Sequence, residues 1–348
     1  MSKNEFTIAI DAMGGDYAPE EIIKGLLLAR KEFPELNFNV YGRIEKIQPL
    51  LPDDDEQIKV FDAQQVIEMG DEPVKAMRQK KQSSMVLAAE SVKEGQSDAL
   101  FSAGNTGALL ASAIFIVGRI KGVARPALLT VLPSVKNPKR NWILMDVGAN
   151  AESKSHYLYQ FAILADFYAR KMMKLKKPEV KLLNNGLEED KGDQVHIQAH
   201  QLLKNSKLNF TGNIEARELL SGDTDIVVSD GFTGNAALKT IEGTALSIFG
   251  GLSGAIKAGG LRAKIGGYLV RPSLRKFAKI LDYNNAGGAV ILGVNAPVVK
   301  THGSAKAQAV KNTIGQLKDM LETNIVNDVK KYVDKNEKSF AIKLGEDE

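Results

Sequence analysis

The 348-residue sequence contains no cysteine and only four histidines. Without cysteine, the chain cannot form a disulfide framework, a cysteine-ligated zinc or iron–sulfur site, or a catalytic thiol. No apolar run reaches the roughly 18 residues that a membrane-spanning helix needs. The N-terminal residues also lack the apolar stretch of a secretory signal peptide. These absences predict a cytoplasmic protein.

Several common catalytic motifs are also missing. The sequence has no G-x-G-x-x-G after a predicted strand, no G-x-x-x-x-G-K-[ST], no G-x-S-x-G and no H-E-x-x-H. These gaps argue against a standard dinucleotide-binding fold, a P-loop ATPase and a serine hydrolase. His196 and His200 would share one helix face, but no third ligand accompanies them. We therefore expect a solvated helix there and no metal site.

Acidic residues are absent between Glu242 and Asp282. Seven basic residues lie in that stretch, whereas the net charge of the whole chain is only +4, so the remainder is net acidic. A nucleic-acid-binding protein would spread its positive charge more widely. The local patch instead predicts one acidic partner or an anionic membrane surface. Its members are Lys257, Arg262, Lys264, Arg271, Arg275, Lys276 and Lys279.

The same region, residues 243–281, has amphipathic spacing. Apolar residues recur at helical intervals from Leu261 to Leu269 and again from Leu274 to Leu281. We expect two short helices, broken near Gly266-Gly267 and near Pro272. Their apolar faces, flanked by Lys and Arg, suit a membrane interface or an acidic protein partner. Packing on the core or on a second subunit is an equally good interpretation.

The rest of the chain alternates strands, glycine-rich loops and helices, which predicts an α/β fold with a mostly parallel sheet and helices on both faces. The apolar runs 127–132 and 142–145 are joined by a turn and favour a hairpin. We expect one α/β unit over residues 1–333. It divides into two lobes, about 1–125 plus 285–333 and about 126–284. A polar tail covers 334–348.

Five predicted strands end in polar or glycine-rich turns. Carboxyl ends of parallel strands open on one sheet edge, and glycine lets backbone N–H groups approach an anion. We therefore expect an oxyanion such as phosphate at that edge, although each turn alone fits ordinary turn and cap chemistry. The turns begin at Asp11, Ser102, Asp146, Asn184 and Asp230.

Six short segments together resemble the bacterial phosphate acyltransferases of phospholipid synthesis. They occur in order between about residue 6 and residue 325. Residues 125–127 and the turn at Asp230 are also similar to phosphotransacetylases and phosphotransbutyrylases. The six segments are IDAMGGD (10–16), SAGNTGA (102–108), MDVGAN (145–150), GNIEAR (212–217), DGFTGN (230–235) and LGVN (292–295).

This resemblance implies the three-layer fold that phosphotransacetylases share with isocitrate and isopropylmalate dehydrogenases. It implies transfer of a long-chain acyl group from acyl carrier protein to inorganic phosphate, without a cofactor. The acyl phosphate would serve a membrane glycerol-3-phosphate acyltransferase. The resemblance also implies a cytoplasmic homodimer that associates peripherally with the membrane and does not bind nucleic acid.

The candidate site residues fall into three groups. Asp230 and Asp146 would orient donors or take a proton, and backbone N–H groups near Gly104 would hold phosphate. The catalytic candidates are Asp230, Asp146, Asn105, Thr233 and Asn235. The phosphate-binding candidates are Ser102, Gly104, Asn105, Thr106, Lys239, His302 and Ser304. The substrate-binding candidates are Asp11, Gly14, Gly15, Asp16, Asn150 and Asn184.

Two other functions compete with this hypothesis. A nicotinamide-dependent dehydrogenase could share the fold, but its adenine, ribose and metal sites are not evident in the sequence. A non-catalytic scaffold that binds acyl carrier protein and membrane would explain the basic stretch but not the polar strand ends. The sequence leaves open the acyl-chain preference, the aspartate that moves a proton, and whether the basic stretch contacts lipid or protein.

Overall fold

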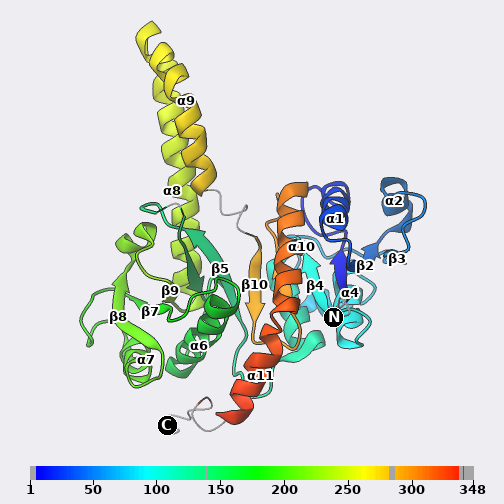
Figure 1. Ribbon diagram of the computed structural model, residues 1–348, viewed down its shortest axis with the longest axis horizontal. Coiled ribbons are helices and arrows are strands. Elements are labelled where there is room, and N and C mark those ends of the chain that lie inside the picture. Colours follow the sequence, from blue (N-terminus) through cyan, green and yellow to red (C-terminus); the bar gives the residue numbers. More distant parts are fainter. Residues whose placement is uncertain (1–4, 138, 282–286, 337–339, 341–348) are drawn as a thin grey trace.

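In the computed structural model, eleven strands form one sheet in the order β3-β2-β1-β4-β11-β10-β5-β6-β9-β7-β8 (Figure 1). The structure describes residues 5–137, 139–281, 287–336 and 340, and only the backbone of 275–281. The strands are β1 (Phe6–Asp11), β2 (Leu36–Gly42), β3 (Ile58–Asp62), β4 (Ala99–Ser102), β5 (Ala127–Pro133), β6 (Asn141–Met145), β7 (Glu179–Asn184), β8 (Asn209–Glu215), β9 (Ile226–Val228), β10 (Ala289–Leu292) and β11 (Val298–Lys300).

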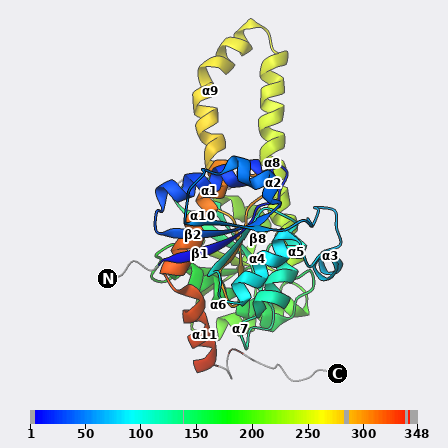
Figure 2. The ribbon, with the colours of Figure 1, turned by 90° about the vertical axis from the view of Figure 1, so that its right-hand side faces the viewer.

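Helices cover both faces of this sheet (Figures 1 and 2). They are α1 (Glu20–Glu32), α2 (Ile44–Ile47), α3 (Pro73–Gln79), α4 (Ser84–Lys93), α5 (Thr106–Ser112), α6 (Ser155–Lys171), α7 (Gln194–Lys204), α8 (Gly231–Ala258), α9 (Leu261–Leu281), α10 (Ala307–Glu322) and α11 (Ile325–Lys335). Two 3₁₀ segments, Gln48–Leu50 and Ala216–Ser221, and a π-helical segment, Ala113–Gly118, complete the helical structure of the described residues.

Strand β1 illustrates how the sheet builds two cores. Successive strand side chains point to opposite faces. Ile8 and Ile10 therefore join the apolar cluster that contains Ile23 of α1, whereas Ala9 joins the cluster that contains Val86 of α4. Burial on both faces explains why this strand is almost continuously apolar, as parallel strands in covered sheets are. The predicted α/β fold is confirmed.

The strand directions correct one expectation from the sequence. β1, β4, β11 and β5 run one way, whereas β6, β9, β7 and β8 run the other. The reversal comes from the antiparallel β5–β6 pair, which confirms the hairpin expected at 127–145. The five polar turns therefore do not share one sheet edge, because each half of the sheet is parallel only within itself.

The helices α8 and α9 form a hairpin that projects from the body of the molecule (Figures 1 and 2). At 1.5 Å per residue, the 28 residues of α8 span about 42 Å. The expected breaks are wrong: the helices join at Gly259-Gly260, and α9 continues through Gly266-Gly267 and Pro272. A Cβ on Gly267 would collide with the Ile256 side chain. That glycine therefore permits close contact between the helices and does not end one.

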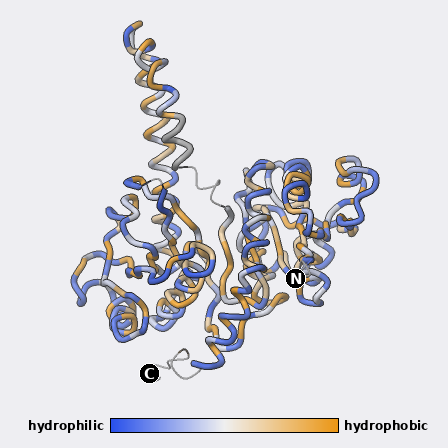
Figure 3. Tube along the Cα trace, viewed as in Figure 1, coloured by the Kyte–Doolittle hydropathy of each residue, from blue (hydrophilic) through white to orange (hydrophobic). Residues whose placement is uncertain are grey.

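Hydrophobic residues alternate with hydrophilic ones along the hairpin (Figure 3). Leu246 and Leu261 are both 76% exposed, and Tyr268 is 75% exposed. None of the described helices combines the length and the apolar character that crossing a membrane requires. Most of the expected tail, residues 334–348, lies outside the described residues, although α11 extends to Lys335.

Candidate functional site

Three loops after parallel strands meet backbone to backbone. The loop after β1 contacts the loop after β4, because a Cβ on Gly14 would lie 2.7 Å from the Gly104 nitrogen. The same loop contacts the segment after β11, where the Asp16 N–H donates to the Gly303 carbonyl at 2.8 Å. Gly15 adopts a φ of +110°, which only glycine reaches without strain. Gly14, Gly15, Gly104 and Asp16 therefore lie together, as the sequence suggested.

The side chain of Asp11 stabilises the contact between the loop after β1 and the loop after β4. Its carboxylate is buried and accepts hydrogen bonds from Ser84 Oγ at 2.6 Å and Ser102 Oγ at 2.7 Å. Ser102 Oγ in turn accepts the Gly104 N–H at 3.0 Å. Burial raises the pKa of Asp11, although the two serine hydroxyls oppose that shift. Asp11 and Ser102 thus use their polar atoms to position the Gly104 loop.

Asn105 caps α5. Its Oδ1 accepts the Ala108 N–H at 3.0 Å. Its Nδ2 lies 3.1–3.2 Å from the carbonyls of Glu68, Met69 and Asp71. The amide is therefore occupied within the protein, and Thr106, the first residue of the helix, is the side chain that reaches the pocket described below.

Asp146 organises the loop after β6. Its two oxygens accept five hydrogen bonds, from the backbone N–H groups of Leu128, Gly148, Ala149 and Asn150 and from the Asn150 side chain. Burial raises the pKa of Asp146, and the bonds from Ala149 and Asn150 oppose that shift. Asn150 also donates to the Pro126 carbonyl. With every lone pair engaged, Asp146 positions the loop.

Asp230 begins α8 beside that loop. Its carboxylate caps the helix by accepting the Thr233 N–H at 2.8 Å. The Gly231 N–H donates to the Asn150 carbonyl at 2.8 Å, and a Cβ on Gly234 would collide with the Asp146 carbonyl. The side chains of the neighbouring residues Thr233 and Asn235 are exposed.

His196 is a neighbour of Asp230 that the sequence analysis assigned to a solvated helix. Its Nδ1 lies 2.7 Å from an Asp193 oxygen, and its Nε2 lies 3.7 Å from an Asp230 oxygen. Partial burial opposes ionisation of Asp193, but hydrogen bonds from the His196 side chain and backbone lower its pKa overall. His200 points elsewhere and contacts Asn213 at 2.9 Å. The two histidines therefore do not act as a pair.

Asn184 stays within its own loop. Its Nδ2 donates to the Lys191 carbonyl at 3.0 Å, and its Oδ1 accepts the Asn185 N–H at 2.8 Å. Both ends of the amide are thus used locally. None of these contacts joins Asn184 to the loops after β4 or β11.

A small pocket opens where the two halves of the sheet meet, with a volume of about 90 Å³. Leu128 pairs with Ile291 across the sheet, and Ile291 pairs with Val298, two residues before Lys300. Met145, the last residue of β6, pairs with Leu129, next to Leu128. The loop after β6 therefore lies level with the helix that follows β4. The pocket is lined by Thr106, Gly107, Leu109, Leu110, Leu128, Gly148, Ala149, Ile291 and Lys300.

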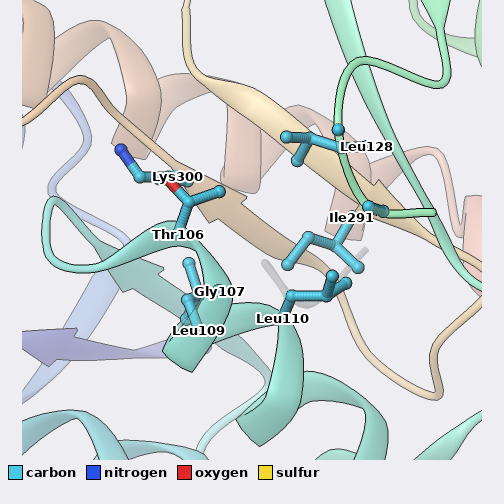
Figure 4. A pocket seen from close by; sticks show the side chains of 9 residues that line it. Thr106, Gly107, Leu109, Leu110, Leu128, Ile291 and Lys300 are labelled. Carbon is cyan, nitrogen blue, oxygen red and sulfur yellow. The ribbon is translucent and has the colours of Figure 1, made fainter. Parts of the chain in front are cut away.

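The pocket has a polar end and an apolar end. Figure 4 shows the side chains of Lys300 and Thr106 side by side, with Leu110, Leu128 and Ile291 grouped away from them. A small anion at Lys300 would therefore have an apolar surface next to it. This arrangement can hold a small charged reactant next to the carbonyl group of a second reactant that has an apolar chain.

Lys300 is the site residue that the sequence analysis missed. It is only 9% exposed, and its ammonium donates to the Thr301 carbonyl at 2.9 Å. Burial and the positive charge of Lys239 lower its pKa to about 8, although Asp16 acts in the opposite direction. The sequence did contain a signal for this residue. Lysine is almost never fully buried unless it has a partner, so a lysine at the end of the apolar strand Val298–Lys300 is unusual.

Three further candidates surround Lys300. His302 Nδ1 lies 2.8 Å from Ser304 Oγ and accepts the Ser304 N–H, so the neutral ring carries its proton on Nε2. Partial burial and the charges of Lys300 and Lys239 lower the pKa of His302. Lys239 of α8 is exposed and pairs with Glu242 at 2.6 Å. Lys239, Lys300 and His302 are thus close enough to affect one another's ionisation.

The predicted basic patch lies on the hairpin, distant in sequence from these groups. Lys257, near the end of α8, and Arg262, Lys264 and Arg271 of α9 lie on its described part. The side chains of Arg275, Lys276 and Lys279 lie outside the described residues.

Comparisons with known proteins agree with this architecture. The phosphotransacetylase of Streptococcus pyogenes superimposes with a TM-score of 0.57 at 16% identity, over 93% of this chain and 95% of that one. At this identity the likeness concerns the fold alone. The molecule therefore has the phosphotransacetylase-like α/β fold that the resemblance implied.

The sequence relatives are more specific. A family model described as "Fatty acid synthesis protein" matches residues 6–328. A phosphate acyltransferase of Oenococcus oeni is 65% identical over 98% of this chain and 99% of its own length. One of Leuconostoc mesenteroides is 60% identical over 94% and 95%. The chain belongs to the phosphate acyltransferase family, and it is an acyltransferase.

Proposed function

We propose that this enzyme transfers a long-chain fatty acyl group from the thioester of acyl carrier protein to inorganic phosphate. Lys300 is the observation that carries the proposal. Among the described residues, no carboxylate oxygen lies within 4.0 Å of its buried ammonium. A buried cation that lacks an anionic partner favours an anionic ligand. The phosphate acyltransferases of Oenococcus oeni and Leuconostoc mesenteroides suggest which ligand this is.

The chemistry requires little beyond correct placement. Phosphate is itself the nucleophile, and a thiolate with a pKa near 8.5 is a good leaving group. An enzyme nucleophile is therefore unnecessary. Holding phosphate in line with the thioester carbonyl can supply about 7–11 kcal/mol of the barrier reduction. A donor to the developing oxyanion can add roughly 3 kcal/mol.

The pocket suggests a placement for both reactants. Phosphate would bind at the polar end, near Lys300, Thr106 and His302, where the cations favour it. The carbons next to the thioester would lie against Leu110, Leu128 and Ile291. Asp146 and Asp230 would hold the loops that frame the site. The Asp146 hydrogen bonds leave it no free lone pair with which to take a proton.

The hairpin suggests the partners. We propose that its apolar and basic side chains contact an anionic membrane surface or the acidic carrier protein. The enzyme would act as a cytoplasmic homodimer, bound peripherally to the membrane, and supply acyl phosphate to a membrane glycerol-3-phosphate acyltransferase for phospholipid synthesis. The division into lobes, about 1–125 plus 285–333 and about 126–284, is part of the same proposal.

The test is a direct assay. Purified enzyme, palmitoyl-loaded acyl carrier protein and inorganic phosphate are mixed, and free thiol is followed over time. After removal of residual thioester, hydroxylamine traps acyl phosphate. We expect thiol release that requires phosphate, is absent with sulfate and matches the trapped product in amount.

A scaffold that only binds acyl carrier protein and membrane is the second candidate, favoured by the exposed apolar residues of the hairpin. It predicts binding of both partners without phosphate-dependent thiol release. Absence of release from folded, dimeric enzyme would therefore overturn the proposed reaction.

A further inference from the structure

We propose that Lys300 is a catalytic residue that gives a proton to the departing thiolate and then recovers one from the phosphate hydroxyl. This inference rests on the proposed function and assigns the proton path within it. Three observations support it. Lys300 lies in the pocket, its ammonium has unused hydrogen-bonding capacity, and the neighbouring titratable side chains already form hydrogen bonds or ion pairs within the protein.

The position of Lys300 is suited to both reactants. Lys300 and Thr106 lie at one end of the pocket, and Leu110, Leu128 and Ile291 lie at the other (Figure 4). An ammonium has three N–H donors, and the described contacts of Lys300 use one, to the Thr301 carbonyl. The remaining donors allow one group to contact both a phosphate oxygen and the sulfur of a thioester.

The neighbouring titratable groups are less suited to this role. Asp146 accepts five hydrogen bonds, and Asp230 is occupied as the cap of α8. His302 is engaged through Nδ1 with Ser304, and positive neighbours disfavour its protonated form. Lys239 is exposed and paired with Glu242. Lys300 is the buried group in this part of the described chain whose proton remains available.

The step balances without an added reactant. An oxygen of HPO₄²⁻ attacks the thioester carbonyl carbon, the new C–O bond forms, and the C–S bond breaks. As sulfur leaves, the Lys300 ammonium protonates it to the thiol. The neutral amine then takes the proton of the phosphate hydroxyl. The products are the acyl phosphate dianion and free thiol, and Lys300 is again an ammonium.

The electrostatic surroundings support this exchange. Burial and Lys239 lower the pKa of Lys300 to about 8, against the influence of Asp16. Glu242 of α8, His302 after β11 and the buried Asp11 of β1 are further titratable groups on the elements around this end of the pocket. A thiol has a pKa near 8.5, so proton transfer between the two groups is nearly balanced, which suits general acid catalysis.

The experiment compares Lys300→Arg and Lys300→Met with wild type. Arginine keeps the positive charge but does not release a proton in proteins. For Lys300→Arg we expect a phosphate KM within about three-fold of wild type but a kcat lowered about 100-fold. Lys300→Met should lose phosphate affinity as well as rate. Lys204→Arg, at an exposed position on α7, is the matched control and should behave as wild type.

The pH profile supplies a readout that a purely structural role would not affect. We expect the wild-type kcat/KM to fall above pH 8, as Lys300 of the free enzyme loses its proton, and Lys300→Arg to lack this fall. Circular dichroism checks that each variant is folded. An active wild type with Lys300→Arg equally fast across the pH range would overturn this inference alone. An inactive wild type would overturn the proposed reaction and this inference with it.

Discussion

The two ends of helix α8 lie in opposite environments. At its first turn, Gly231 and Gly234 pack so closely on the Asn150 and Asp146 backbones that neither has room for a side chain. Toward its other end, Gly250 has no neighbour within 4 Å of an added Cβ, and Leu246 is 76% exposed. One helix therefore contributes to a tightly packed site and to a surface that is left open. Glycine permits close backbone packing at the first turn, whereas no neighbouring group requires it at Gly250.

Polar groups show a similar contrast. In the loops of the body, the carboxylates of Asp11 and Asp146 satisfy neighbouring donors and fix the chain. Lys300 is buried as well, yet most of its hydrogen-bonding capacity remains unused. The satisfied groups maintain the structure, and the unsatisfied one is where we propose that phosphate binds.

The largest predicted effect is the difference between Gly234→Ala and Gly250→Ala, the same substitution at the two ends of α8. At 234 the new methyl group collides with the Asp146 carbonyl, and we expect a loss of about 3 kcal/mol or more in unfolding free energy. At 250 the methyl group meets nothing, and better helix propensity should stabilise the protein by about 0.5–1 kcal/mol. Urea denaturation measures both. Equal effects would show that the packing contrast is wrong.

The next largest effect is expected from Asp146→Asn. However the amide is oriented, its NH₂ group must face at least two N–H donors that the carboxylate oxygens now accept. Buried donors left unsatisfied should cost about 2–4 kcal/mol. Asp223→Asn, at an exposed ion pair with Lys136, is the control and should leave stability almost unchanged. If Asp146→Asn were as stable as the wild type, that result would contradict the role of Asp146 in positioning the loop.

A third prediction concerns the pH dependence of stability. Lys300 has a folded-state pKa of about 8, below the 10.5 of an ordinary lysine. Between these values the unfolded chain binds more protons, so stability should rise with pH in this window. From pH 7.5 to 9.5 the expected gain is about 2 kcal/mol. Lys300→Met should lack this gain in urea titrations at the two pH values. An identical gain in both proteins would show that Lys300 is not buried as a cation.

The smallest effect on stability is expected in the hairpin. Leu261→Ser with Leu269→Ser removes two side chains that are already more than 70% exposed, so the unfolding free energy should change by less than about 0.5 kcal/mol. Co-sedimentation with anionic lipid vesicles should nevertheless fall several-fold. Leu28→Ser, on α1 of the body, serves as the control. Unchanged vesicle binding would favour the carrier protein or a second subunit as the partner of this surface.

Local sequence was informative where the determinants were local. Alternating strands and helices indicated the α/β fold, and the apolar runs 127–132 and 142–145 indicated the β5–β6 hairpin. The single sheet edge was wrong because β5 and β6 are antiparallel, so the carboxyl ends of β6, β9 and β7 point away from those of β1 and β4. The breaks in α9 were also wrong, since Gly267 allows contact with Ile256 and does not interrupt the helix.

The sequence by itself determined most of the strands and helices, the short motifs of the family resemblance and the concentration of positive charge between Glu242 and Asp282, because each depends on residues close together in the chain. Only the tertiary structure decided which polar residues support the loops and which remain available. Asp146 and Lys300 are both charged residues at strand ends. The environment that separates their roles is built from Leu128, Thr106 and Asp16, which come from other strands and loops. Burial and hydrogen-bond satisfaction are properties of those long-range contacts.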